Sequence, residues 1–283
     1  MVVRTPTVRR RRLANELRRL REATSLTIEQ VAETLECSSS KVSRIETAQV
    51  SPAPRDVRDM LQLYGVTVER AEALLQLARE ARQKAGLYAE YKTLPFVIYA
   101  ELEAAAESTN VYSAQGLPGF LQTADYAHAV LRAIRQDLRS QPEEIERRVG
   151  LRLARQDRLT KDHTPMAWVV LDEAVLRRVV GGRETMRAQL EHLGELADLP
   201  NVTLQVLPFS AGAHAGMDGS FYILNFPDTS DPDVVYIENT TSDLYLEDIG
   251  AIRRYEQLFN HLRAAALDPD ESITFVANAA KGL

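Results

Sequence analysis

The sequence predicts a multidomain protein: an all-α N-terminal domain of five helices over residues 1–85, then an α+β domain with a small mixed sheet over residues 86–283. Three observations support this division. Apolar residues recur at helical spacing throughout the first 84 residues, strand-like runs appear only from residue 166 onward, and the two parts differ in charge. With 283 residues, the chain can form two hydrophobic cores.

The most informative stretch covers residues 27–46, TIEQVAETLECSSSKVSRIE, which predicts two short helices joined by a tight turn. Thr27 can cap the first helix, and Gln30 can complete a capping box. Ser38 can cap the second helix, where Val42 and Ile45 point inward. The outward side then carries small hydroxyls and cations, which suit a helix that enters the DNA major groove. A helix pair used only for packing is the alternative, but packing requires no outward Ser, Lys or Arg.

This stretch and the helices around it are similar to a known family. The runs Leu17-Arg-Arg-Leu-Arg21, Leu26-Thr27, Val31-Ala32 and Val42-Ser-Arg-Ile-Glu46 resemble the phage-repressor-like (Xre-type) helix-turn-helix. The resemblance covers about residues 9–84 and implies a domain of five helices that binds double-stranded DNA.

Carried over by position, the resemblance implies three groups of functional residues. The base-contacting positions are Ser39, Ser40 and Arg44. The positions near DNA phosphates are Thr27, Lys41 and Ser43. An ion pair that ties the first helix to the recognition helix is implied for Arg21 and Glu46. The chain departs from the family pattern at Ile28, where a phosphate-binding Gln is frequent, and at Glu36 and Ala48, where Gly is usual.

Charge is distributed unevenly along the chain. The whole chain has a net charge of −6, but residues 1–84 hold 16 Lys and Arg against 11 Asp and Glu, whereas the rest holds 18 against 29. A basic first domain followed by an acidic second domain is expected when only the first domain binds DNA. The first 12 residues form a basic arm that includes Arg9, Arg10 and Arg11. The arm either contacts the minor groove and phosphates or is a frayed, solvated terminus.

The single cysteine, Cys37, excludes an intramolecular disulfide and a cysteine-based metal cluster. Its place in the turn between the two helices favours a buried, inert thiol over a redox switch. No apolar run approaches membrane-spanning length and no signal-peptide pattern is present. We therefore expect a cytoplasmic protein that does not contact a membrane.

The second domain mixes helical and strand patterns after a short junction at residues 86–95. Helices are predicted over residues 96–106, 124–137, 142–160, 184–199 and 246–267, and a constrained turn over residues 111–122. Strands are predicted over residues 166–171, 202–207, 219–226 and 234–238. The helix at residues 142–160 is rich in arginine and presents either a partner-binding face or a solvated face.

Six blocks of the second domain carry a further resemblance. They begin Gly116-Leu-Pro-Gly-Phe-Leu-Gln122, Arg152-Leu-Ala-Arg-Gln156, Leu171-Asp-Glu-Ala174, Gln189-Leu-Glu-His-Leu193, Pro200-Asn-Val-Thr-Leu204 and Gly216-Met-Asp-Gly-Ser-Phe221. In this order they are similar to the C-terminal domain of actinobacterial Xre-type regulators of the WhiJ-like group. The resemblance implies a transcription regulator whose gene is often paired with one for a short partner protein, in an antitoxin-like arrangement.

No enzymatic motif stands out. None of the five histidines has the helical spacing of a zinc site, and no nucleophile elbow or phosphate-binding loop is present. His214 lies in a Gly-rich loop together with Asp218, where it either lines a ligand or partner site or bonds to its own loop. Asp172 and Glu173 can serve as acid and base, or Asp172 can cap a helix. We therefore expect that the protein is not an enzyme and that it binds no metal and no cofactor.

The expected function is therefore a sequence-specific DNA-binding transcription regulator. Because one such module reads only a short half-site, we expect a homodimer on a two-fold site. Two alternatives stay open for the second domain. It either binds a small cognate protein, with DNA binding serving mainly to regulate its own operon, or it senses a small molecule at the loop around His214.

Overall fold

The computed structural model describes residues 8–81, 88–91, 93–94, 96–134, 141–160, 165–227, 232–239 and 243–283. The chain forms two compact units, Met1–Leu102 and Glu103–Leu283. The predicted boundary between residues 85 and 86, and much of the predicted junction, fall outside the described residues. Within the described residues, no helix combines the length and the apolar character needed to cross a membrane.

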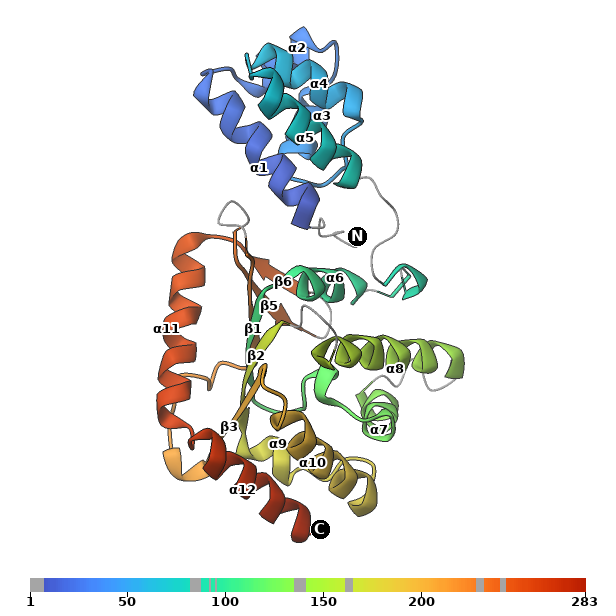
Figure 1. Ribbon diagram of the computed structural model, residues 1–283, viewed down its shortest axis with the longest axis vertical. Coiled ribbons are helices and arrows are strands. Elements are labelled where there is room, and N and C mark those ends of the chain that lie inside the picture. The colour runs from blue at the N-terminus through green and yellow to red at the C-terminus, as the bar shows by residue number, and fades with distance from the viewer. Residues whose placement is uncertain are drawn as a thin grey trace. The chain divides into compact units, whose positions relative to one another are not determined.

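The first unit contains the five predicted helices, which confirms an all-α N-terminal fold (Figure 1). They are α1 (Val8–Ala23), α2 (Ile28–Thr34), α3 (Ser39–Glu46), α4 (Pro54–Leu63) and α5 (Val68–Ala81), followed by a short 3-10 turn, η1 (Ala89–Tyr91). Their apolar faces meet in one core that includes Leu13, Leu17, Val31, Val57 and Met60. Cys37 is half-buried at the edge of this core.

The two caps predicted from the sequence hold α2 and α3 at their first turns. Gln30 N–H donates to the Thr27 hydroxyl (3.2 Å), while Thr27 N–H donates to Gln30 Oε1 (2.8 Å), which makes a capping box. Lys41 N–H donates to the Ser38 hydroxyl (3.2 Å). Each cap satisfies backbone donors that a helix start leaves unpaired, so the turn between α2 and α3 is defined by local chemistry.

Two of the departures from the family pattern lie in left-handed backbone. Glu36, in the turn between α2 and α3, has φ of 49°, and Ala48, after α3, has φ of 56°. A side chain with a Cβ atom is strained there, by roughly 1–2 kcal/mol relative to glycine. The family glycines therefore have a conformational reason, and this chain keeps the turns at a cost in stability.

Glu36→Gly is expected to stabilise the first unit by about 1 kcal/mol, because relief of backbone strain exceeds the extra entropy that glycine gains in the unfolded chain. Glu33→Gly, the same substitution inside α2, is the matched control and should destabilise by about 1 kcal/mol. Both side chains are exposed, so packing changes little. Urea unfolding followed by circular dichroism measures both effects, and two changes of equal sign would contradict the assignment of strain to Glu36.

The second unit is built on a six-stranded mixed sheet, which confirms the α+β class but exceeds the small sheet predicted. The strands are β1 (Ser108–Ser113), β2 (Met166–Asp172), β3 (Val202–Leu207), β4 (Phe221–Asn225), β5 (Val234–Glu238) and β6 (Asp243–Leu246). Their order across the sheet is β3-β2-β1-β4-β5-β6. β1, β2 and β3 run parallel, and β4, β5 and β6 add antiparallel strands beyond β1.

Helices cover both faces of this sheet (Figure 1). They are α7 (Ala124–Ile134), α8 (Pro142–Gln156), α9 (Glu173–Arg177), α10 (Arg183–Ala197), α11 (Ile249–Ala265) and α12 (Pro269–Lys281). A further helix, α6 (Val97–Ala105), crosses the division between the two units. Short 3-10 turns stand at η2 (Gly119–Leu121), η4 (Asp157–Thr160) and η5 (Phe209–Ala211). α11 packs on one face through Ile252, Phe259 and Leu262, while α9, α10 and α12 pack on the other.

The outer edge of β3 is occupied by the chain's own backbone and side chains. Val206 N–H donates to the Ser272 hydroxyl (2.9 Å), and Leu267 N–H donates to the Val206 carbonyl (2.9 Å). At the other end of the strand, Val202 N–H donates to the Leu199 carbonyl (3.0 Å). Leu267, in the segment that joins α11 to α12, and Ser272 of α12 therefore cover the C-terminal part of this edge.

Candidate nucleic-acid interface

The helix α3 presents the residues that the sequence assigns to base contact. Ser39, Ser40 and Arg44 are exposed, while Val42 and Ile45 are buried against the core of the first unit. The amphipathic spacing of α3 fixes this orientation, because the two inward residues stand three positions apart on one helix face.

Arg44 lies along the surface of its own helix. Its Nε donates to the Ser40 carbonyl one turn earlier (3.2 Å), and its terminal Nη groups have no hydrogen-bond partner within the described residues. The Ser40 hydroxyl is 3.1 Å from the Ser38 hydroxyl. The guanidinium therefore keeps the donors that read guanine in a bidentate contact.

The three positions assigned to phosphates have different surroundings. Thr27 is exposed and uses its hydroxyl oxygen as the α2 cap, and Ser43 is half-buried on α3. Lys41 is already engaged, because its Nζ lies 2.9 Å from Asp56 Oδ2 on α4. Nothing in the local sequence pattern indicates this partner, since Lys41 and Asp56 meet only through the packing of α3 and α4.

A bidentate ion pair joins α1 to α3, at the two residues that the family resemblance pairs. Arg21 Nε donates to Glu46 Oε1 (2.8 Å) and Arg21 Nη2 donates to Glu46 Oε2 (2.9 Å). Arg21 Nη1 also donates to the Leu26 carbonyl (2.9 Å). The side chains are only 11% and 3% exposed, so both charges are largely removed from water. The bond to Glu46 raises the pKa of Arg21, and burial raises the pKa of the neighbouring Tyr64.

The prediction of a basic arm over residues 1–12 is wrong from residue 8 onward. α1 begins at Val8, so Arg9, Arg10 and Arg11 belong to a helix and not to an extended arm. Arg11 is buried. The sequence prediction missed this because a run of arginines carries no apolar periodicity, although arginine has good helix propensity. Residues 1–7 lie outside the described residues.

In the second unit, His214 holds its own loop. Gly216 N–H donates to His214 Nδ1 (3.1 Å), and His214 Nε2 lies 3.5 Å from Asp172 Oδ2. Asp172 in turn caps α9 by accepting from Ala174 N–H (2.8 Å). Burial raises the pKa of Tyr112, and the Asp172 carboxylate beside it raises that pKa further. Both ring nitrogens of His214 thus face partners within the protein.

The loop that His214 anchors also exposes large apolar side chains. Phe209 and Met217 are 59% and 72% exposed, and Asp218, which follows Met217 in the chain, is exposed as well. Gly216 packs so closely on the Tyr112 ring that an added Cβ atom would lie 2.3 Å from Tyr112 Cε1. The loop is therefore fixed at its base and apolar at its surface.

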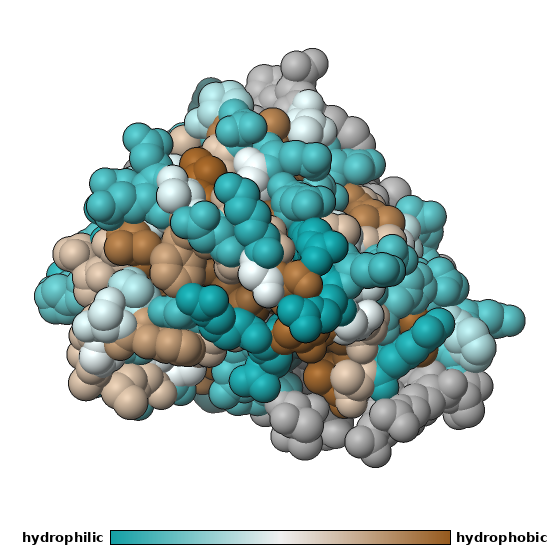
Figure 2. Space-filling model, turned by 90° about the horizontal axis from the view of Figure 1, so that it is seen from below, coloured by the Kyte–Doolittle hydropathy of each residue, from teal (hydrophilic) through white to brown (hydrophobic). Residues whose placement is uncertain are grey.

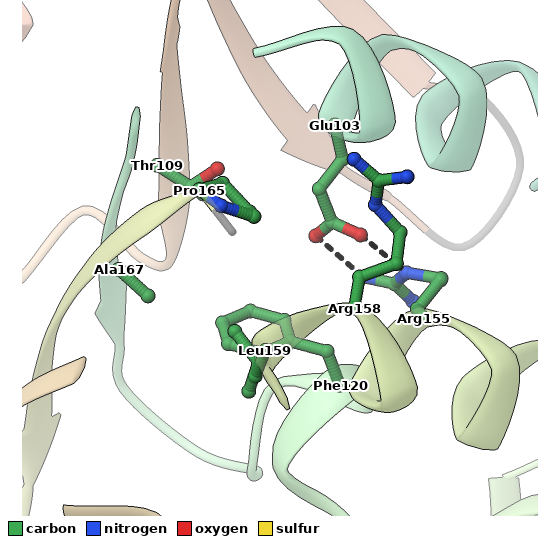
Figure 3. A pocket seen from close by; sticks show the side chains of 8 residues that line it. All are labelled: Glu103, Thr109, Phe120, Arg155, Arg158, Leu159, Pro165 and Ala167. Atoms are coloured by element: carbon green, nitrogen blue, oxygen red, sulfur yellow. Dashed lines mark hydrogen bonds and ion pairs between the residues drawn. The ribbon is translucent and has the colours of Figure 1, made fainter. Parts of the chain in front are cut away.

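A cavity of about 20 Å³ lies between the start of β1 and β2 and the end of α8 (Figure 3). Apolar side chains form most of its wall, and the Glu103–Arg155 ion pair lies on one side. The buried Thr109 hydroxyl also faces this region and makes no hydrogen bond within the described residues. This volume accommodates one water molecule, so in this conformation the cavity cannot hold a metabolite.

The arginines of α8 mostly point into the protein, and the expectation of a solvated or partner-binding face is wrong for them. Arg155 donates to Glu103 through Nε (2.6 Å) and Nη2 (2.8 Å), and Arg158 of η4 donates to the Ala104 carbonyl (2.7 Å). Arg152 Nε donates to Gln122 Oε1 (3.1 Å). Burial, and then the nearby Arg155 charge, lowers the pKa of Arg152 to about 10.

Other classes of site have little support in the described part of the chain. No three His, Cys, Asp or Glu side chains there form a group that could hold a metal ion. On the face of the molecule drawn in Figure 2, hydrophobic side chains lie in small patches between hydrophilic ones. Scattered apolar side chains of this kind are normal on a folded domain.

Comparison with known families matches both parts of the chain. Residues 12–75 match the model described as a helix-turn-helix domain, the class of DNA-binding module that α2 and α3 form. Residues 96–278 match the model described as a domain of unknown function (DUF5753). No curated protein and no solved structure matches the chain. The chain therefore belongs to the DUF5753 family and carries a helix-turn-helix domain ahead of that domain.

Proposed function

We propose that this protein is an Xre-type transcription regulator that binds a two-fold operator as a homodimer and reads bases with Ser39, Ser40 and Arg44. The exposed Nη groups of Arg44 on α3 carry the proposal, because they are the donors best suited to a guanine edge. A single module of this type reads few base pairs, which favours paired half-sites. Its proposed target is chromosomal DNA, so we place its action in the cytoplasm.

The second unit, in this proposal, binds a small cognate protein and has no catalytic role. Support comes from the loop anchored by His214, whose exposed Phe209 and Met217 offer apolar contact area. The WhiJ-like, antitoxin-like arrangement implied by the sequence resemblance agrees with such a partner. A small-molecule sensor is less well supported, because His214 is occupied within its loop and the cavity beside Arg155 has room for only one water molecule.

Arg44→Ala is expected to cost about 1–3 kcal/mol of operator affinity and to relax sequence choice at one position of each half-site. Selection of bound duplexes from a random pool, followed by affinity measurement on the best site, tests this. Arg79→Ala is the matched control, since Arg79 is exposed on α5 and its loss removes the same charge. The control should keep the selected motif.

Two other outcomes would change the proposal. An Arg44→Ala protein that selects the same motif as strongly as the wild type removes Arg44 from base reading. Weak binding without any motif in the wild type itself would instead favour the partner-binding activity of the second unit as the primary function.

A further inference from the structure

Lys41 belongs to the proposed DNA-binding surface, but its ammonium group is already paired with the Asp56 carboxylate. Lys41 stands in the first turn of α3, two residues after Ser39, and Asp56 stands in the first turn of α4. The Nζ–Oδ2 distance is 2.9 Å, and the side chains are 40% and 27% exposed. The pair is therefore accessible to solvent and to any anion that approaches α3.

The first turn of α4 favours an acidic residue. Ala53 at its N-cap provides no side-chain hydrogen bond, so Asp56 is the acidic residue of the first turn that interacts favourably with the positive end of the helix dipole. A carboxylate oxygen offers an ammonium group the same kind of partner as a phosphate oxygen, because lysine binds either one as a point charge. Asp56 thus holds Lys41 in the way that a DNA phosphate would.

The two ion pairs that α3 makes with other helices among the described residues differ in whether they can exchange partners. Arg21 and Glu46 are buried and bonded twice, so no phosphate can replace Glu46. Lys41 and Asp56 make one contact at the surface, and a single exposed pair of this kind is weak. Only the second pair can open when DNA arrives.

We propose that Asp56 competes with the DNA phosphate for Lys41 and thereby sets the affinity of the protein for duplex of any sequence. The proposal rests on the proposed DNA-binding function. Lys41 must leave Asp56 to bind a phosphate, and the Asp56 carboxylate then stands close to the phosphate it has made room for. Sequence choice is unaffected, because phosphate contacts carry no base information.

The test is a double-mutant cycle on a short duplex of random sequence, with Asp56→Asn measured in the wild-type and in the Lys41→Gln backgrounds. Asp56→Asn should tighten binding by roughly fivefold with Lys41 present, the upper end of what one exposed ion pair contributes, and by less than about twofold without it. The slope of log affinity against log salt should stay unchanged in Asp56→Asn and become shallower by about 0.9 in Lys41→Gln.

Asp59→Asn is the matched control, because Asp59 lies on the same helix and faces Arg55 at 3.9 Å. It removes the same charge, and its effect should be equal in both backgrounds. The competition would be overturned if Asp56→Asn raised duplex affinity equally in both backgrounds. It would also be overturned if the effect of Asp59→Asn on affinity depended on Lys41 as strongly as the effect of Asp56→Asn does. If the wild type binds no duplex at low salt, the proposed function fails and the competition fails with it. A wild type that binds, together with an uncoupled cycle, removes only the competition.

Discussion

Replacing Arg21 by alanine is expected to destabilise the first unit by about 3–5 kcal/mol, because Glu46 then keeps a buried charge without its partner. Water cannot solvate the Glu46 carboxylate in place of Arg21, because the Glu46 side chain is 3% exposed on the inner side of α3. The carbonyl of Leu26 also loses the donor that holds the turn before α2. α3 should therefore lose its fixed position, and DNA binding should be lost with it.

Two controls separate the buried charge from the loss of an arginine. Arg18→Ala, on the same helix, breaks an exposed pair with Glu22 and should cost less than about 0.5 kcal/mol. The double variant Arg21→Met with Glu46→Leu replaces both charges by apolar groups and should restore most of the stability. Urea unfolding monitored by circular dichroism measures all three. A double variant as unstable as Arg21→Ala would contradict the electrostatic explanation.

The second large effect is expected in the other unit, at Arg155. Its side chain is 1% exposed and is bonded twice to Glu103, itself 11% exposed. Arg155→Ala should cost about 3–5 kcal/mol, because the buried Glu103 carboxylate loses the two charge-assisted hydrogen bonds from Arg155 and the cavity beside it is enlarged (Figure 3). The only tryptophan, Trp168, lies in β2, so its fluorescence reports unfolding of this unit.

Arg147→Ala is the matched control for Arg155→Ala. Arg147 lies on the same helix, is 40% exposed and faces Glu144 at 3.5 Å, so its removal should shift the tryptophan transition by less than about 0.5 kcal/mol. Arg21→Ala should also leave this transition in place if the two units unfold separately. If Arg155→Ala and Arg147→Ala shifted the tryptophan unfolding transition equally, the buried Arg155–Glu103 pair would contribute no more stability than an exposed pair.

Local sequence signals predicted the first unit well. The caps at Thr27 and Ser38 and the spacing of Val42 and Ile45 depend only on residues a few positions apart, so they can be recognised without a structure. The start of α1 was placed too late, because a run of arginines gives no apolar periodicity even where it is helical.

The central strand of the sheet could not be recognised in the same way. β1, with the sequence STNVYS, lies between β2 and β4 and is polar over its first half. Ser108 and Asn110 find partners in Asn225 of β4, which stands more than a hundred residues later. A strand whose polar groups are satisfied by such distant residues carries no strong local pattern. The short β6 and the final helix α12 were missed as well.

The candidate interface shows the same limit. The exposed positions on α3 follow from the helix period, but the partner of Lys41 follows from how α3 meets α4. Likewise, the arginines of α8 resemble a solvated face until the sheet and Glu103 are placed beside them. In both cases the sequence identifies the charge, and only tertiary packing decides whether water, a protein group or a ligand faces it.

The partly covered outer edge of β3 limits how this protein can assemble by extension of its sheet. Fibre growth by sheet extension needs two open edges on every copy, one to accept a strand and one to offer it. Because the Val202 N–H and both backbone groups of Val206 already have partners within the chain, the edge at β3 is less open to a strand of another copy. Repeated strand addition through both edges of the sheet is therefore disfavoured, which protects copies at high local concentration from polymerising by this route.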